Sequence, residues 1–398
     1  MSDASLVLKR GRERWILEGH PWIFRAAVAK EPKGQPIGEI VEVLDWRGKF
    51  VGKGFYNSNS SITLRVLTRN QDEEINSNWM AKRIHQAVDL RRRAFDDTIT
   101  SGYRLIHGEN DFLPGLVVDR YGEFLVMQIH TLGMDRWREV IVEALMNQVS
   151  PKGIFERSDV GARQGEGLDT LPVGVLAGEV PPDRVPFLEN GMSFVCDVHT
   201  GQKTGFFLDQ RDNRLTVSAF CQDAQVLNCF SYSGGFSVFA AHGGAQAVES
   251  VDASEPALVL AKENLSLNGF DPNDHPCIQE NVFDHLKACK DGGRQFDVVI
   301  VDPPAFAKSL GALKRASRAY VRLNRMAIEV LKPGGILVSA SCSSAVDDET
   351  YVGFLRLAGA ETKRSIQVIK THLNSIDHPG FVAFPEGRYL KCFFCVVT

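Results

Sequence analysis

The alternation of apolar and polar positions changes character near residue 190. Before that point, short stretches in which every second residue is apolar are broken by Gly, Asn and Ser, which is typical of strands in a meander or small barrel. These stretches lie at Gly38–Asp45, Lys49–Tyr56 and Ile62–Leu67. Residues 1–70 are therefore predicted to form a small β-rich module, and the polar segment Asn70–Asn78 is predicted to be a linker.

Helical and strand patterns are mixed between this linker and residue 190. Met80–Phe95 predicts a helix, and its basic face would carry Lys82, Arg83, Arg91, Arg92 and Arg93. Leu116–Ile129 predicts a hairpin that turns at Gly122, and apolar residues recur at helical spacing from Trp137 to Leu145. A segment rich in Gly and Pro follows, from Gly161 to Pro186.

From about residue 191 strands and helices alternate, which is the pattern of a parallel sheet with right-handed crossovers. The helix after the second strand is well marked, because Ser254 can cap it and Gly269 can end it. The last strand has no helix after it. The predicted strands are Val226–Cys229, Ala247–Val251, Cys277–Gln279, Val298–Val301, Ile336–Ala340 and Tyr389–Val397. The fold class predicted for this part is α/β, an open sheet.

Composition narrows the class of protein. A chain of 398 residues with 44 % hydrophobic and 24 % charged residues is ordinary for a globular protein of two or three domains. No apolar run approaches the roughly 18 residues of a membrane span, and no signal peptide is visible. The eight cysteines all lie from Cys196 onward at irregular spacing. Reduced thiols and a cytoplasmic location are expected.

The net charge of −4 hides an asymmetry. Residues 1–70 carry twelve Lys and Arg against seven Asp and Glu, a formal charge of +5, so the remainder carries −9. A basic module on an acidic body is compatible with a polyanionic partner such as nucleic acid. A solvated charged face explains the same pattern, so the charge alone leaves both interpretations open.

In open α/β sheets ligands bind beyond the carboxyl ends of the strands, where the strand order reverses. The first predicted strand leads into a loop with two glycines that would let the backbone approach a ligand. A nicotinamide or flavin dinucleotide is disfavoured, because the chain lacks a G-x-G-x-x-G motif. The candidate cofactor-binding residues of this loop are Asn228, Ser231, Tyr232, Gly234 and Gly235.

Asp252 ends the second strand and is placed to accept hydrogen bonds from both ribose hydroxyls of an adenosine. The alternative is that its carboxylate only caps the helix that follows.

A candidate reaction centre lies at the ends of the fourth and fifth strands. The fourth strand ends in Asp302-Pro-Pro, where two prolines remove N–H donors and leave carbonyls and a carboxylate. The fifth ends in Ser341-Cys342-Ser343. If these strands are neighbours, about 4.8 Å apart, Asp302 and Cys342 emerge side by side. The alternative for Cys342 is a small buried hydrophobic residue.

No metal site is expected. Cys392 and Cys395 resemble half of a zinc site, but residues i and i+3 of a strand point to opposite faces, so packing in the core is favoured. None of the ten histidines stands with a carboxylate at a spacing that argues for a metal or a hydrolytic triad.

At these motifs the chain resembles the bacterial 23S rRNA 5-methylcytosine methyltransferases that carry an N-terminal PUA domain. The likeness covers nearly the whole chain. It rests on the motifs Gly19-His-Pro-Trp-Ile-Phe24, Lys203-Thr-Gly-Phe-Phe-Leu-Asp-Gln-Arg-Asp-Asn213, Asn228-Cys-Phe-Ser-Tyr-Ser-Gly-Gly-Phe236, Asp302-Pro-Pro-Ala-Phe-Ala-Lys308 and Ser341-Cys-Ser343.

The resemblance implies three domains and a cofactor. A PUA RNA-binding domain is expected over residues 1–73, a small α+β middle domain over 74–190, and a Rossmann-like methyltransferase domain that binds S-adenosylmethionine over 191–398. The segment that contains Gln210 and Arg211 would close the cofactor pocket, and Asn281 matches a position that commonly contacts the adenine amino group.

The resemblance also implies a reaction. Cys342 would add to C6 of a cytosine in 23S rRNA and raise the electron density at C5, while Asp302 would hydrogen-bond or protonate N3. The target base must be unstacked, and Phe306 and Tyr232 are possible stacking surfaces or simply packing residues. Many RNA 5-methylcytosine enzymes have a second cysteine after the proline of the Asp-Pro motif, where this chain has Pro304. What releases the product therefore stays open.

The residues are also compatible with two other functions. The Asp-Pro-Pro loop also resembles that of enzymes that methylate the amino groups of guanine or adenine, which need no cysteine. A non-catalytic ribosome-assembly factor could keep the cofactor pocket as a relic. The expected partner is ribosomal RNA, free or in an assembly intermediate, with Lys82–Arg93 and the first module as its hypothetical docking face. No membrane partner is expected, and a homodimer is left open.

Overall fold

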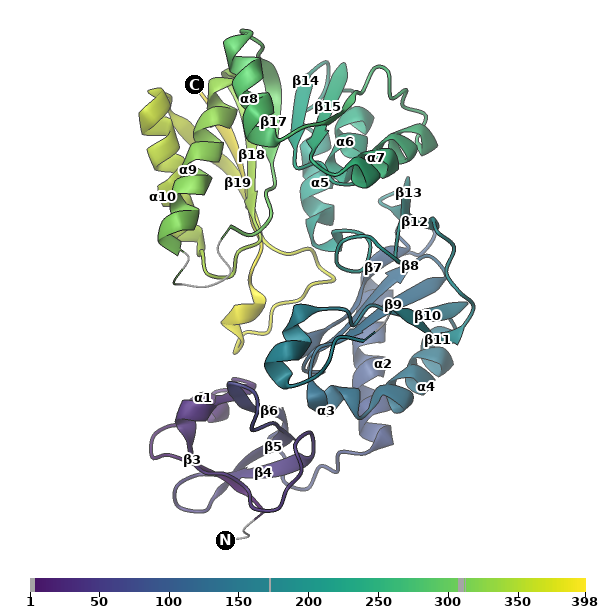
Figure 1. Ribbon diagram of the computed structural model, residues 1–398, viewed down its shortest axis with the longest axis vertical. Helices are drawn as coiled ribbons and strands as arrows, with labels where there is room; N and C mark the ends of the chain where they lie inside the picture. Colours follow the sequence, from purple (N-terminus) through teal and green to yellow (C-terminus); the bar gives the residue numbers. More distant parts are fainter. Residues whose placement is uncertain (1–3, 172, 307–310, 312) are drawn as a thin grey trace. The chain divides into compact units, whose positions relative to one another are not determined.

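The computed structural model describes residues 4–171, 173–306, 311 and 313–398, and these group into two compact units (Figure 1). The first unit runs to Val185 and includes two later segments, Asp197–Gly205 and Ile376–Gly387. The second unit contains Pro186–Cys196, Phe206–Ser375 and Arg388–Thr398. Of the helices described, none is long and apolar enough to cross a membrane.

The first unit begins with a six-stranded sheet in the order β2-β6-β5-β4-β1-β3. Its strands are β1 (Leu6–Leu8), β2 (Trp22–Phe24), β3 (Val28–Lys30), β4 (Ile40–Leu44), β5 (Phe50–Tyr56) and β6 (Ile62–Thr68), with a short helix α1 (Arg14–Leu17). The alternation in β4 buries Val41 and Val43 and exposes Glu42. Gly54 is needed in β5, because a Cβ there would lie 1.9 Å from the carbonyl oxygen of Arg65 on β6. The predicted β-rich module is confirmed.

The second sheet of this unit has the order β11-β10-β9-β8-β7 and is packed against two long helices. Its elements are α2 (Ser77–Ala94), β7 (Gly102–His107), β8 (Leu116–Tyr121), β9 (Phe124–Ile129), α3 (Leu132–Asp135), α4 (Arg138–Val149), β10 (Gly153–Glu156) and β11 (Gly174–Gly178). Helix α2 is capped by Asn76, whose side chain accepts a hydrogen bond from the Trp79 N–H at 3.0 Å. The expected helices and the hairpin at Gly122 are therefore present.

One residue of the expected basic face is misplaced. Arg91 lies four residues after Ala87 and three after Val88, on the stripe of α2 that faces the core, and it is 1 % exposed. Its guanidinium forms a bidentate ion pair with Asp111 at 2.7 and 2.8 Å. It also donates to the Asp377 carbonyl oxygen at 2.7 Å. Arg91 is therefore an internal residue and not part of a solvent-exposed docking face.

The second unit is built on a seven-stranded sheet in the order β16-β15-β14-β17-β18-β20-β19. The strands are β14 (Gln225–Cys229), β15 (Ala247–Asp252), β16 (Cys277–Gln279), β17 (Phe296–Val301), β18 (Leu331–Ser341), β19 (Ile366–His372) and β20 (Lys391–Val397). Strands β14 to β18 are parallel, and β20 runs antiparallel to both β18 and β19. The order therefore reverses between β14 and β17, which is where such sheets bind ligands.

Helices cover both faces of this sheet. The helices are α5 (Arg211–Ser218), α6 (Gly235–His242), α7 (Glu255–Leu267), α8 (Val282–Asp291), α9 (Leu313–Glu329) and α10 (Asp348–Thr362). Leu227 and Cys229 of β14 face the core formed with α8, α9 and α10. Asn228 points to the opposite face and donates to Ser237 Oγ of α6 at 2.9 Å. The predicted α/β sheet and the capping of α7 by Ser254 are confirmed.

A hairpin of β12 (Val185–Glu189) and β13 (Met192–Cys196) is fastened to α7. The amide oxygens of Asn264 and Asn268 accept hydrogen bonds from the Val195 and Ser193 N–H groups at 2.8 and 2.9 Å.

A polar cluster lies between β15 and α8. The ligand atoms of Glu249, His285 and Cys289 all lie within 4.8 Å of one another, an arrangement that could hold a metal ion. Arg294, however, donates to Glu249, and its guanidinium lies 3.7 Å from Cys289 Sγ. Hydrogen bonds with Cys289, Glu249 and Glu280 raise the pKa of His285 to about 10. A protonated imidazole and a guanidinium already balance the carboxylates, so the cluster is best described as an ion-pair network.

His285→Gln is expected to reduce the free energy of unfolding by about 3 kcal/mol at pH 6, because it leaves buried Glu249 without its imidazolium partner. The pKa of the folded state is raised, so this stabilisation is complete below pH 6.5 and is lost as the pH rises towards 10. Urea unfolding of both proteins between pH 6 and 10 measures the difference. His242→Gln, at an exposed histidine of α6, is the matched control. A difference that does not change with pH would contradict the assignment.

Candidate active site

The loop between β14 and α6 holds an unusual backbone. Phe230 and Tyr232 have φ of +61° and +46°, a region that bulky residues rarely adopt, and Gly234 has φ of +78°. Gly234 is needed for a second reason, since a Cβ there would lie 2.9 Å from Ala261 Cβ of α7. Strained loops of this kind are concentrated at ligand sites. The two-glycine loop that the sequence indicated therefore packs closely against α7.

Three polar atoms of this loop region are buried without a hydrogen-bond partner among the described residues. They are Asn228 Oδ1, Ser231 Oγ and Ser233 Oγ. Buried polar groups are nearly always satisfied, so an unsatisfied cluster in a strained loop fits a polar ligand that supplies the partners.

Asp252 fixes this loop from the end of β15. Its Oδ2 accepts a hydrogen bond from the Tyr232 N–H at 2.9 Å, and its Oδ1 accepts one from the Ser254 N–H at 2.9 Å. Helix α7 itself is capped by the Ser254 hydroxyl, so capping is not the role of Asp252. Each carboxylate oxygen keeps a second lone pair for a ligand hydroxyl.

Asn281 lies at the end of the next strand, β16, and begins α8. Its side-chain oxygen accepts a hydrogen bond from the Phe283 N–H at 2.9 Å, and the residue is exposed.

Asp302 is tied to the segment that precedes α5. Gln210 Nε2 donates to Asp302 Oδ2 at 2.9 Å, and Gln210 Oε1 accepts a hydrogen bond from Asn213. Asn213 Oδ1 lies 3.0 Å from His372 Nδ1 of β19. Gln210 is 2 % exposed, so a buried polar chain fixes the orientation of the Asp302 carboxylate. Arg211 is also buried and lies 3.9 Å from Glu189.

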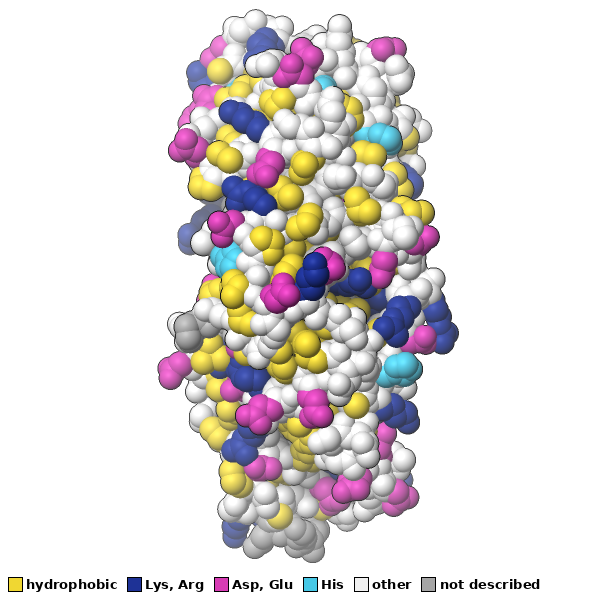
Figure 2. Space-filling model, turned by 90° about the vertical axis from the view of Figure 1, so that its right-hand side faces the viewer, with side chains coloured by type: hydrophobic (Ala, Val, Ile, Leu, Met, Phe, Trp, Pro, Cys, Tyr) yellow, Lys and Arg dark blue, Asp and Glu magenta, His cyan; other side chains and the backbone are white. Residues whose placement is uncertain are grey.

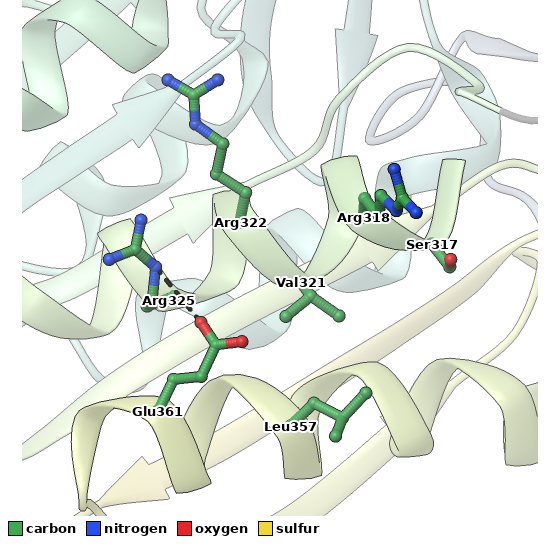
Figure 3. Close-up of a pocket in the computed structure, with 7 residues that line it drawn as sticks. All are labelled: Ser317, Arg318, Val321, Arg322, Arg325, Leu357 and Glu361. Carbon is green, nitrogen blue, oxygen red and sulfur yellow. Dashed lines mark ion pairs between the residues drawn. The ribbon is translucent and has the colours of Figure 1, made fainter. Parts of the chain in front are cut away.

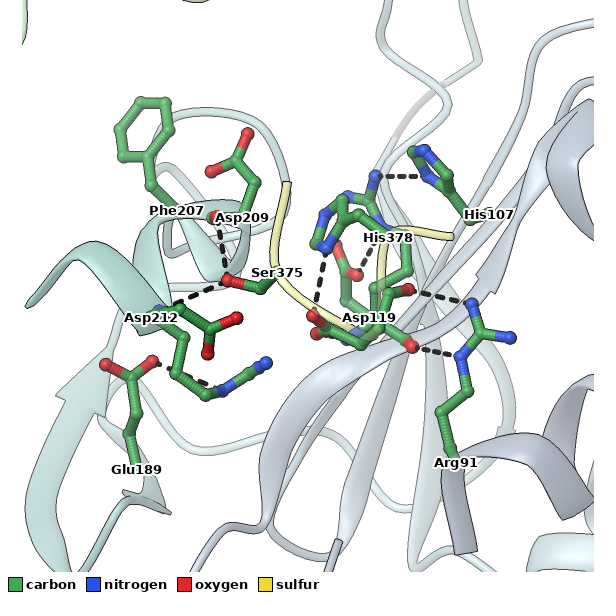
Figure 4. A network of polar contacts seen from close by, with 12 residues as sticks. Arg91, His107, Asp119, Glu189, Phe207, Asp209, Asp212, Ser375 and His378 are labelled. Carbon is green, nitrogen blue, oxygen red and sulfur yellow. Dashed lines mark hydrogen bonds and ion pairs between the residues drawn. The ribbon is translucent and has the colours of Figure 1, made fainter. Parts of the chain in front are cut away.

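The same segment is anchored by residues near the C-terminus that the sequence did not single out (Figure 4). The Ser375 hydroxyl donates to the Asp209 carbonyl oxygen at 2.9 Å and accepts from the Asp212 N–H at 3.3 Å. The Tyr389 hydroxyl donates to Asp209 Oδ2 at 2.6 Å. A lone serine and a tyrosine at the start of a strand carry no sequence signal of such a role.

Asp302 and Cys342 follow adjacent strands. Strands β17 and β18 are paired in parallel with Val301 opposite Ser339, so Asp302 and Cys342 both follow the carboxyl ends of adjacent strands. The Tyr320 hydroxyl of α9 lies 2.9 Å from the Oγ of Ser341, the residue before Cys342. Burial raises the pKa of Tyr320, its hydrogen bond with Ser341 lowers it, and electrostatic interactions with Cys342 and Asp302 raise it. Cys342 is half-buried, unlike Cys392 and Cys395 in the core.

Lys391 holds the loop after Cys342. It lies opposite Ser341 in the β18–β20 pair and is 2 % exposed. Its ammonium donates to the Ser343 carbonyl oxygen at 2.7 Å and to the Val346 carbonyl oxygen. Burial lowers the pKa of Lys391. The sequence analysis did not single out Lys391, although a lysine at the first position of an otherwise apolar strand is an unusual feature.

The two aromatic residues considered as stacking surfaces have partners within the fold. The Phe306 ring lies 4.9 Å from the Tyr320 ring, and the Tyr232 ring lies 5.1 Å from the Phe207 ring. Both residues are half-buried. Pro304, where related RNA enzymes have a second cysteine, is exposed.

Family models match both parts of the chain. A PUA-like domain matches residues 6–69, and the S-adenosylmethionine-dependent methyltransferase model matches residues 173–381. The chain belongs to the S-adenosylmethionine-dependent methyltransferases. Among relatives of this methyltransferase, a Klebsiella pneumoniae (strain 342) protein named ribosomal RNA large subunit methyltransferase I is 40% identical over 392 residues, 98% of each chain. A protein of the same name from Erwinia tasmaniensis is 41% identical over 394 residues, 98% of this chain and 99% of its own.

Solved structures share the fold of this methyltransferase. The crystal structure of SMU.776 complexed with SAH has a TM-score of 0.86 at 23% identity and covers 98% of this chain and 99% of its own. A chain from Streptococcus mutans has a TM-score of 0.85 at the same identity and coverage. The predictions of an α/β methyltransferase fold, a PUA-like first domain and S-adenosylmethionine as cofactor are confirmed. The unsatisfied polar atoms beside Asp252 fit such a cofactor.

Lys391→Met is expected to cost about 1–3 kcal/mol of unfolding free energy, because the Ser343 and Val346 carbonyl groups lose their buried donor. Hydrogen exchange of the Ser343–Val346 amides should accelerate more than that of β15. Lys370→Met, at an exposed lysine of β19, is the control. Equal protection of Ser343–Val346 in Lys391→Met and wild type would show that the lysine does not hold this loop.

Proposed function

We propose that this methyltransferase methylates C5 of a cytosine in 23S ribosomal RNA through a covalent adduct between Cys342 and C6 of the base. The observation that carries the proposal is the pairing of β17 with β18, from whose ends a carboxylate and a half-buried thiol emerge together. The names of the relatives, which act on large-subunit ribosomal RNA, support the substrate class.

A thiol is what this reaction needs, because C5 of cytosine is a poor nucleophile. Attack of the Cys342 thiolate on C6 forms a C–S bond and moves electron density to N3 and C5. Asp302, oriented by Gln210, would hydrogen-bond or protonate N3 and so stabilise that charge. S-adenosylmethionine, when bound, supplies an electrophilic methyl group. Loss of the C5 proton to a base then expels the Cys342 thiolate and restores the aromatic ring.

The cofactor would be held beside this pair. Asp252 would accept hydrogen bonds from the ribose hydroxyls, and Asn281 would contact the adenine amino group. The strained loop would bind the amino-acid part through its unsatisfied polar atoms. The segment with Gln210 and Arg211 would close the pocket. The proposed cofactor-binding residues of the loop are Asn228, Ser231, Tyr232, Gly234 and Gly235.

The direct test is methyl transfer from labelled S-adenosylmethionine to unmodified 23S rRNA, with mass spectrometry of the product nucleoside. We expect 5-methylcytidine. Cys342→Ala should lower turnover by more than about 1000-fold, because no other group can activate C5. Cys277→Ala, at the other half-buried cysteine, should remain active. A methylated purine, or full activity in Cys342→Ala, would contradict the covalent mechanism.

Asp252→Asn should weaken S-adenosylmethionine binding about 10- to 100-fold, because hydrogen bonds to a charged acceptor are replaced by weaker ones. Calorimetric titration measures this directly. Asp271→Asn, in an exposed loop, serves as the control. An unchanged affinity in Asp252→Asn would remove this carboxylate from the cofactor site.

A further inference from the structure

Helix α9 presents two chemically opposite faces. Its buried face carries Ala316, Tyr320, Leu323 and Ala327, which pack into the core of the second unit. Its outer face carries a run of cations at helical spacing. These are Lys314, Arg315, Arg318 and Arg322, all exposed, followed by half-buried Arg325. The helix therefore joins a packed side and a strongly basic side.

Most of these cations form no ion pair with an acidic residue in the described part of the chain. Arg325 is paired with Glu329 at 3.2 Å and with Glu361 at 3.4 Å. The Arg322 guanidinium lies over the Phe283 ring, 4.9 Å from its centroid. Arg315 and Arg318 form no ion pair with any residue that the structure describes. Like charges three and four residues apart destabilise a helix, so this row is unfavourable unless a polyanion neutralises it.

Two arginines of α2 are used differently. On α2, Arg91 is paired with Asp111 and Arg93 with Asp89, and both are satisfied within the protein. The molecular face in Figure 2 mixes dark blue basic and magenta acidic side chains. The row on α9 is therefore a local concentration of positive charge on a chain whose net charge is −4.

A groove with an apolar floor runs beside the row (Figure 3). Val321 of α9 and Leu357 of α10 form its floor, and Arg318 and Arg322 project from its α9 side. Cations over an apolar floor suit the phosphates and sugars of a nucleic acid strand. From Arg315 to Arg322 the helix rises about 10 Å, the length of about three phosphates along one strand.

The same helix reaches the reaction centre. Tyr320 lies between Arg318 and Arg322 in the chain, and its hydroxyl is 2.9 Å from Ser341 Oγ, next to Cys342. Its ring lies 4.9 Å from Phe306, which follows the Asp302-Pro-Pro turn. Tyr320 faces the core, on the side of α9 opposite the row. Because α9 connects the parallel strands β17 and β18, its N-terminal end, with Lys314 and Arg315, lies towards the carboxyl edge of the sheet, where Asp302 and Cys342 follow their strands.

We propose that the row Lys314, Arg315, Arg318 and Arg322 on α9 binds the phosphate backbone of the substrate RNA strand whose base enters the site. This inference rests on the proposed function for its substrate. The row lies in the same unit as Asp302 and Cys342. The row contributes affinity and register, whereas Asp302 and Cys342 act on the base.

The test compares Arg315→Gln/Arg318→Gln/Arg322→Gln with wild type, using an unmodified 23S rRNA transcript and fluorescence anisotropy at several salt concentrations. We expect the Kd to rise about 10- to 100-fold at 0.1 M salt, and the salt slope to fall by about two to three. The Kd for S-adenosylmethionine should not change. Arg315→Gln/Arg318→Gln, which leaves the Phe283 contact intact, should show a smaller loss in the same direction.

Two controls make the result specific. Lys287→Gln/Lys290→Gln/Arg356→Gln removes the same charge from exposed positions of α8 and α10 and should bind RNA like wild type. Arg315→Lys/Arg318→Lys/Arg322→Lys keeps the charge and should retain most of the affinity. Equal RNA affinity in the α9 glutamine triple and the α8/α10 triple would overturn the docking surface. A wild type that forms no 5-methylcytidine would contradict the proposed function instead, and product analysis identifies that case.

Discussion

The parallel register of β14, β17 and β18 is the constraint on which the rest of the site depends. Val226 is paired with Val298, and Val298 is paired in turn with Ile336, so the three strands end at the same edge of the sheet. A slip of one residue would turn Asp302 to the other face, because side chains alternate along a strand. Buried Val, Ile and Leu residues on both faces prevent that slip.

Around this edge, buried polar residues orient the reactive ones. Gln210 holds Asp302, the Tyr320 hydroxyl contacts the strand end before Cys342, and Lys391 holds the loop after it. These side chains come from segments far apart in the chain. Because each is buried, its hydrogen bonds are strong, and loss of one partner leaves the other unsatisfied. These hydrogen bonds therefore restrict the orientation of the Asp302 carboxylate and of the loop after Cys342.

The arginines of this protein fall into two groups: some are buried and paired with carboxylates, and others are exposed at the surface. Arg91 and Arg214 form bidentate pairs with Asp111 and Glu189 and are almost fully buried. Arg315 and Arg318 are exposed and form no ion pair with a described residue. A planar guanidinium suits both an internal carboxylate and a phosphate. Whether a guanidinium pairs with an internal carboxylate or is exposed to a phosphate depends on its surroundings in the folded protein. Counting charges along the chain could not distinguish these two uses.

The sequence by itself determined the α/β class, six strands of the seven-stranded sheet, the capped helix after Asp252 and the strands that end just before Asp302 and Cys342, but it did not indicate β19 (Ile366–His372). Local periodicity and strong turn residues carry that information, because neighbouring residues in the chain decide it. The tertiary structure alone decided that Gln210, Tyr320 and Lys391 surround the pair, and that Arg91 is internal. It also decided that α9 carries the unpaired row. Those facts depend on contacts between residues distant in sequence. The local patterns of a single sequence do not specify such contacts.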